Sequence, residues 1–155
     1  MFDKWKLAKA IAIPVIGGAV TGLLTGGGMR DFAMLNKPPL SPPGWLFPIV
    51  WTILYTLMGI SSYLIYENST GEKRRQALFL YATQLIVNLL WSFFFFVLDW
   101  YLFSFVWLVV LWVMIFQMIR EFSEISKIAA YINIPYLLWV TFAGYLNLGI
   151  WWLNR

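Results

Sequence analysis

The side chains that could do chemistry in this 155-residue chain are uncharged and recur every three or four positions. Residues at that spacing share one face of a helix. Three such stripes occur, each mixing aromatic side chains with polar or small ones: Trp51, Tyr55, Met58 and Ser62; Tyr81, Gln84, Asn88, Trp91 and Phe95; Tyr136, Trp139, Ala143 and Asn147. Together they predict a cavity for a flat, mostly apolar ligand that carries a few polar atoms.

The carboxamides in these stripes have a second interpretation. Gln84, Asn88 and Asn147 should point into a helical bundle, because an amide facing lipid leaves its donors and acceptors unpaired. For each single amide, a hydrogen bond between helices worth about 0.6 kcal/mol explains this placement as well as a ligand contact does. Taking the stripes together, we expect the ligand-binding residues to be Trp51, Tyr55, Gln84, Asn88, Trp91, Trp139, Ala143 and Asn147.

Two residue types are missing from the chain. It has no Cys, so disulfides, thiolate metal sites and cysteine nucleophiles are excluded. It has no His either, which removes the usual general base and the commonest zinc or haem ligand. We therefore expect no metal site, no catalytic acid–base pair and no obligatory cofactor.

The composition places the chain in a membrane. Hydrophobic residues make up 61% of it, charged residues 12%, and the mean hydropathy is +0.74, whereas soluble domains have about 25% charged residues. Five apolar stretches are long enough to cross a bilayer as helices: residues 7–26, 46–66, 77–98, 101–119 and 129–153. These runs are continuous rather than alternating, which disfavours a β-barrel. The prediction is one all-α domain over residues 1–155, an integral membrane bundle of five transmembrane helices.

The basic residues divide unequally between the two ends of such a bundle. One end would hold eight of them: Lys4, Lys6, Lys9, Lys73, Arg74, Arg75, Arg120 and Lys127. The other end would hold Arg30, Lys37 and Arg155. By the positive-inside rule we expect a cytoplasmic N-terminus and an external first loop, in a bacterial-type cell membrane. There is no basic stripe or RNA-binding motif, so we expect no nucleic-acid partner.

The loop after the first span and the glycines within that span each have two interpretations. The loop 27–45 carries four prolines within residues 38–43, which makes that part stiff and extended. It is either a lid over the external mouth, formed by Lys37, Pro38, Pro42 and Pro43, or a connector with slack at its glycines. In the first span, the spacing of Gly18, Gly22 and Gly26 favours close helix contact, either inside the monomer or across a homodimer.

Three motifs in the correct order resemble the TspO/MBR family, also known as translocator proteins, tryptophan-rich sensory proteins or peripheral-type benzodiazepine receptors. The motifs are Lys37-Pro38-x-x-x-Pro42-Pro43 followed by Val50-Trp51, then Gln84-x-x-x-Asn88-x-x-Trp91 with Phe95-Phe96, and finally Pro135-Tyr136-x-x-Trp139-x-x-Phe142-Ala143-x-Tyr145-Leu146-Asn147. The resemblance covers nearly the whole chain. The chain departs from it at Asp31-Phe32, where many members have Trp-Tyr.

The resemblance implies a function as well as a fold. It implies five helices, a cavity under the first loop, and a homodimer that binds porphyrins (protoporphyrin IX and haem), isoquinoline carboxamides and, in animal members, cholesterol. It also implies that Trp51, Asn88, Trp139 and Ala143 line the cavity and that residues 37–43 form the lid. We expect a receptor or translocator in tetrapyrrole handling or stress signalling. The alternative is light- and oxygen-dependent degradation of protoporphyrin IX through Trp51 and Trp139. Ion-coupled transport is disfavoured because the stripes carry no charge.

Overall fold

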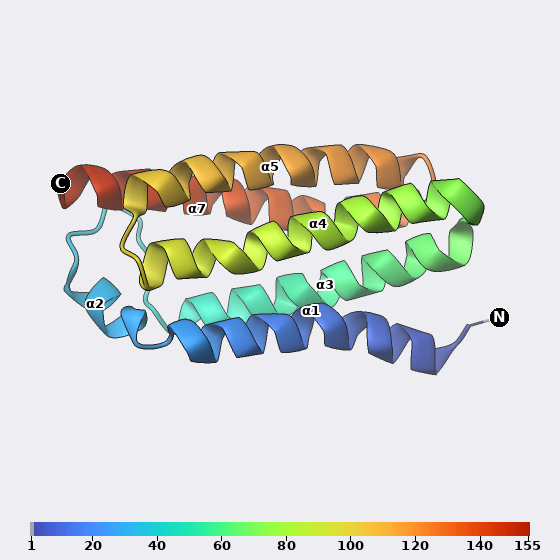
Figure 1. Ribbon diagram of the computed structural model, residues 1–155, viewed down its shortest axis with the longest axis horizontal. Helices are drawn as coiled ribbons and strands as arrows, with labels where there is room; N and C mark the ends of the chain where they lie inside the picture. Colours follow the sequence, from blue (N-terminus) through green and yellow to red (C-terminus); the bar gives the residue numbers. More distant parts are fainter. Residues whose placement is uncertain (1) are drawn as a thin grey trace.

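A computed structural model describes residues 2–155 as an elongated bundle of antiparallel helices (Figure 1). In chain order the helices are α1 (Lys4–Thr25), α2 (Gly28–Met34), α3 (Leu46–Asn68), α4 (Gly71–Phe96), α5 (Tyr101–Ser123), α6 (Lys127–Tyr131) and α7 (Ile134–Leu153). Within residues 2–155 there is no strand. Five segments, namely α1, α3, α4, α5 and the stretch formed by α6 and α7, are long and apolar enough to cross a membrane. This confirms the predicted five-helix membrane bundle.

Several helices extend beyond the apolar stretches that predicted them, most clearly α4 and α5. α4 begins at Gly71 rather than at residue 77, and α5 continues to Ser123 rather than ending at 119. Hydropathy marks only the part of a helix that lipid can cover, whereas backbone hydrogen bonding continues into the polar turns. In the first turn of α4, Arg75 and Glu72 form an ion pair at 2.8 Å, which suits a helix that has left the hydrocarbon region.

The predicted span over 129–153 is confirmed as a membrane-spanning segment, but its helix is interrupted. α6 ends at Tyr131 and α7 begins at Ile134, with Pro135 in its first turn. Proline has no N–H, and its ring would clash with the carbonyl four residues earlier, so the helix restarts rather than continues. The break is tied to α3, because the Asn133 amide nitrogen donates to the Ser61 hydroxyl at 2.6 Å.

The turn between α4 and α5 is longer than the two residues predicted. α4 ends at Phe96, not at residue 98, and the chain reverses over residues 97–100. Asp99 adopts a left-handed conformation with φ of 54°. The backbone N–H groups of Leu98 and Trp100 return to the carbonyls of Phe93 and Phe94, each at 3.0 Å. The reversal makes α4 and α5 an antiparallel pair, as expected.

The first loop is only partly extended. Its first half folds into α2, which the sequence analysis did not predict, and extended backbone begins at Leu35. α2 starts at Gly28, whose Cα lies so near the Phe96 backbone that a side-chain Cβ would overlap it. Glycine therefore permits α2 to pack across the end of α4.

Tight packing lies in the half of the bundle away from α2. There α3 approaches α1 backbone to backbone at Gly59, where a Cβ would lie 2.7 Å from the Ala10 carbonyl oxygen. Side chains that are at most 1% exposed fill the space between α3, α5 and the neighbouring helices: Met58, Ile65, Leu111, Ile115, Met118 and Phe122. Large exposed apolar residues such as Ile16 on α1 and Val110 on α5 suit a surface covered by lipid.

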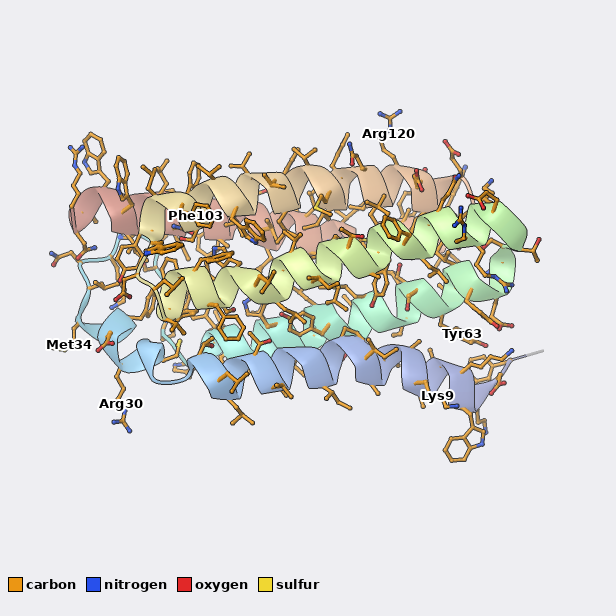
Figure 2. All side chains as sticks on the ribbon, viewed as in Figure 1. Lys9, Arg30, Met34, Tyr63, Phe103 and Arg120 are labelled. Atoms are coloured by element: carbon orange, nitrogen blue, oxygen red, sulfur yellow. The ribbon has the colours of Figure 1, made fainter. Side chains whose placement is uncertain are left out.

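The helix order places the two sets of basic residues at opposite ends of the bundle. The N-terminus, the α3–α4 turn and the α5–α6 turn lie at one end, and α2 and the C-terminus lie at the other (Figure 1). Lys9 lies toward the first end and Arg30 at the second, each pointing away from the bundle (Figure 2). The eight basic residues of the first set thus lie toward the end with the N-terminus, and the three of the second set lie toward the end with α2.

Candidate ligand-binding cavity

A cavity of about 570 Å³ lies in the α2 end of the bundle, between α1, α2, α3, α4 and α7. Sites for small molecules and cofactors commonly measure about 300–1,000 Å³. Every residue that lines the cavity is uncharged, and many of them are aromatic: Phe32, Phe47, Trp51, Tyr55, Trp91, Phe95, Phe96 and Trp139. The cavity therefore suits a flat apolar molecule.

Hydrogen bonds between three helices form the floor of the cavity. The Tyr55 hydroxyl donates to the Asn88 carbonyl oxygen at 2.8 Å, and the Asn88 amide nitrogen donates to the Tyr136 hydroxyl at 2.7 Å. Tyr136 in turn donates to the Gln84 carbonyl oxygen at 2.8 Å. Tyr55 and Asn88 line the cavity, whereas Tyr136 and Gln84 lie behind them.

Among the eight residues predicted to bind the ligand, Gln84 is thus the one that does not reach the cavity. Its side chain has no exposed surface, and its amide nitrogen lies 3.9 Å from the Met58 sulfur. Gln84 and Asn88 share a helix face, so spacing alone could not separate them. Gln84 instead accepts from the hydroxyl of Tyr136 on α7, which is also outside the cavity wall, and only the placement of α7 beside α4 determines this contact.

Asn147 both lines the cavity and joins three helices. Its carbonyl oxygen accepts from the Trp91 indole nitrogen at 3.0 Å and from the Ser104 hydroxyl at 3.1 Å. Its amide nitrogen donates to the Tyr101 carbonyl at 2.7 Å. Hydrogen bonding between helices, the alternative interpretation of the amides, therefore holds for Asn147 alongside its place in the cavity wall.

The two tryptophans singled out by the resemblance lie in the wall together with Ala143. Trp51 stacks on Tyr55 with ring centroids 5.5 Å apart, and Trp139 meets Phe47 edge-on at 5.9 Å. Among the described residues, the buried Trp139 indole N–H has no hydrogen-bond partner. A buried donor without a partner is costly, so this N–H is a destabilising feature of the wall.

α1 supplies a wall that sequence reasoning missed. Gly18 gives room to the Tyr55 ring, so it packs inside the monomer, and Gly22 borders the cavity with no atom within 4 Å of where its Cβ would lie. The spacing of these glycines predicted close approach but could not name the neighbour, and α1 has no aromatic or amide stripe to mark a cavity. A homodimer through Gly18, Gly22 and Gly26 stays a prediction.

The cavity opens sideways between α1 and α3. The exposed residues of its wall all come from these two helices: Ala19, Gly22, Leu23, Pro48 and Thr52. They lie within helices whose outer surface is apolar. The mouth therefore faces the region that lipid would occupy.

α2 covers the end of the cavity. Met29 and Phe32 line it, and the Phe32 ring lies 5.9 Å from Phe47 and 6.1 Å from Phe95. The departure from the family pattern at Asp31-Phe32 therefore leaves an aromatic wall in place. The predicted lid residues Lys37, Pro38, Pro42 and Pro43 are not part of the cavity wall.

The proline segment instead fastens α2 to α7. Asn36 and Asn154 exchange two hydrogen bonds, at 3.0 and 2.8 Å, and the Tyr145 hydroxyl donates to the Pro39 carbonyl at 2.8 Å. Pro38 fills the notch at Gly149, where a Cβ would come within 2.6 Å of the proline ring. We call these contacts the α7 clasp. Nearby, the Lys37 ammonium donates to the Ala33 carbonyl at 3.2 Å and lies 5.1 Å from the Phe32 ring centroid.

We predict that Asn154→Ala loosens α2. The substitution removes both hydrogen bonds to Asn36, each worth about 0.5–1.5 kcal/mol, so hydrogen exchange of the α2 amides should become about tenfold faster. Asn68→Ala is the matched control, because Asn68 also bonds a carbonyl of its own helix but lies at the other end of the bundle. Equal exchange rates in α2 for both variants would show that the clasp does not hold it.

Comparison with known proteins identifies the family of the chain. The model of the TspO/MBR family matches residues 10–153. The tryptophan-rich protein TspO of Chlorobaculum tepidum is 42% identical over 126 residues, covering 79% of this chain and 78% of that protein. The translocator protein of Ovis aries is 36% identical over 92% of this chain and 86% of that protein. The human translocator protein is 34% identical over 97% and 92%. The chain therefore belongs to the TspO/MBR family and is an integral membrane protein.

Proposed function

We propose that the protein is a membrane receptor or translocator-type protein that binds porphyrins, such as protoporphyrin IX and haem, and similar flat apolar ligands such as isoquinoline carboxamides. The observation that carries the proposal is the cavity of about 570 Å³ walled by aromatic rings. The name of one relative, translocator protein, supports a translocator-type protein. The protein's role in this proposal is in tetrapyrrole handling or stress signalling.

The ligand is held by stacking and shape in this proposal. Aromatic rings at the wall, such as those of Trp51 and Trp139, offer offset or edge-on contacts to a flat ring system. With no His or Cys in the chain, a haem would bind through its macrocycle rather than through the usual iron ligands. In this proposal the propionates lie toward Lys37 or Arg30, the basic residues in and just after α2.

The sideways mouth provides the entrance. An apolar porphyrin or carboxamide concentrates in the bilayer, and the exposed wall residues of α1 and α3 face it there. With the N-terminus in the cytoplasm, as the basic residues favour, the cavity and α2 lie in the outer half of the membrane. The protein acts as a homodimer in a bacterial-type cell membrane in this proposal.

A specific observation also favours degradation of protoporphyrin IX as the second candidate. Trp51 and Trp139 both border the cavity, and Trp51 stacks on Tyr55, so an oxidisable indole lies where the ligand would sit. Illuminating the purified protein with protoporphyrin IX in oxygen tests this activity. Loss of product in Trp51→Phe but not in Asn154→Ala would support the enzyme, and no product from the wild type would exclude it.

We predict that Trp51→Phe and Trp139→Phe each weaken protoporphyrin IX binding about three- to tenfold. Each change keeps an aromatic ring but reduces stacking, an interaction worth about 0.5–1.5 kcal/mol. Quenching of tryptophan fluorescence by added porphyrin measures the affinity. Trp112→Phe is the control, because Trp112 lies on α5 outside the cavity and bonds Thr141. Unchanged affinity in both variants would remove these tryptophans from the site.

A further inference from the structure

Four side chains from three helices close into a ring at the cavity floor. Trp51 stacks on Tyr55 with an interplanar angle of 27°, and the Tyr55 hydroxyl bonds Asn88. Asn88 bonds the Tyr136 hydroxyl, and the Tyr136 ring meets Trp51 edge-on, with centroids 6.3 Å apart and an interplanar angle of 73°. Trp51, Tyr55 and Asn88 border the cavity, whereas Tyr136 is outside its wall and only 1% exposed.

Tyr136 contacts the cavity wall through two different parts of its side chain. Its ring edge limits the tilt of Trp51, which is stacked on Tyr55. Its hydroxyl accepts from Asn88 and donates to Gln84, so both of its hydrogen-bonding directions are engaged. The Asn88 carbonyl, held in this way, is the acceptor for Tyr55. Each wall residue in the ring is therefore restrained directly or indirectly by Tyr136.

Gln84 gives the hydroxyl its direction. The Gln84 carbonyl oxygen accepts a hydrogen bond from the Tyr136 hydroxyl, which leaves the Tyr136 oxygen to accept from Asn88. Gln84 is fully buried, so no solvent can take its place. This explains why an amide that does not reach the cavity lies directly behind its floor.

We propose that Tyr136 is a positioning residue for the ligand site: its hydroxyl, oriented by Gln84, sets the geometry of Asn88, Tyr55 and Trp51 at the cavity floor. The proposal rests on the cavity being the ligand site. It assigns to Gln84 an indirect role in binding in place of the direct contact that the sequence predicts.

Tyr136→Phe tests the proposal because it keeps the ring and removes only the hydroxyl. Tyr81→Phe is the matched control, since Tyr81 is also a buried tyrosine outside the cavity wall and, within residues 2–155, its hydroxyl has no hydrogen-bond partner. The first measurement needs no ligand: it is the chemical shift of the Trp51 indole N–H in bilayer nanodiscs, identified by its loss in Trp51→Phe. The second is the affinity for protoporphyrin IX.

We expect the Trp51 indole signal to move and the affinity to fall about fivefold in Tyr136→Phe, with neither change in Tyr81→Phe. A second variant separates positioning from stability. Tyr136→Phe leaves two groups without a partner, the Gln84 carbonyl and the Asn88 amide nitrogen, and adding Gln84→Leu removes the fully buried one of the two. The double variant should therefore regain part of the lost thermal stability while keeping the shifted Trp51 signal and the weaker binding.

The outcomes separate this inference from the proposed function. A Trp51 signal that stays in place in Tyr136→Phe overturns the positioning role, as does an unchanged affinity when the wild type binds. Recovery of the affinity together with stability in the double variant also overturns it. A wild type that binds neither protoporphyrin IX nor an isoquinoline carboxamide overturns the proposed ligand class. In that case the chemical shift of the Trp51 indole N–H, which is measured without ligand, still tests whether Tyr136 positions Trp51.

Discussion

Gly22→Phe should reduce protoporphyrin IX affinity by at least about tenfold, which corresponds to 1.4 kcal/mol, in a protein that still folds. Gly22 borders the cavity at its sideways mouth, and no atom lies within 4 Å of where its Cβ would be. A benzyl group there can occupy the space of the ligand without pushing a neighbour. The fold tolerates the change because glycine inside a helix is itself unfavourable by about 0.5–1 kcal/mol relative to alanine.

Leu24→Phe is the control for this substitution. Leu24 lies on the same helix and is 66% exposed, but it is not part of the cavity wall. It introduces the same side chain two positions away, facing a different direction. Fluorescence titration of both variants in nanodiscs gives the comparison. If Gly22→Phe binds as tightly as Leu24→Phe, the ligand does not occupy the α1 side of the cavity.

Gly59→Ala should lower the free energy of unfolding by about 1–3 kcal/mol, the usual cost of overpacking a well-filled contact. The added Cβ would meet the α1 backbone, 2.7 Å from the Ala10 oxygen and 2.9 Å from the Ile11 nitrogen. A backbone cannot turn aside as a flexible side chain can, so α1 must move away from α3. Thermal unfolding in detergent micelles measures the loss.

Gly144→Ala is the control, and we expect it to leave the free energy of unfolding unchanged or to raise it. Gly144 also lies inside a helix, but the nearest atoms to its Cβ position are 3.9 Å away, on Leu108 and Phe105. This variant should be as stable as the wild type or up to about 1 kcal/mol more stable, because alanine favours the helix. Equal effects of the two substitutions would show that Gly59 does not set the distance between α1 and α3.

Part of the candidate site could be predicted from the sequence and part could not. Trp51, Asn88, Trp139 and Asn147 lie on helix faces that the residue spacing brings together, and all of them border the cavity. Gln84 has the same spacing but does not border the cavity. The glycines of α1 satisfy a single pattern, yet Gly18 packs against Tyr55 while Gly22 opens on the cavity. Periodicity gives the direction of a side chain around its own helix, but not what the neighbouring helix places in front of it.

In the first loop, too, the sequence predicts local conformation but not the contacts between segments. The stiffness of the proline segment was readable from the fixed φ of its prolines, but its contacts with α7 through Asn154 and Gly149 were not. α2 escaped prediction because it is seven residues long and begins among glycines. Its helical form depends on packing across α4 rather than on local preference.

The sequence by itself determined that the helices lie in a membrane and how many long segments can span it. It also determined that neither histidine nor cysteine can act as a ligand, base or nucleophile. These properties depend on composition and on runs of apolar residues. Only the tertiary structure decided which stripe residues border the open space, what α2 and the proline segment each do, and that Tyr136 lies behind the floor. The reason is physical. Hydropathy acts on each segment independently, whereas a cavity is the volume that several helices together leave unfilled.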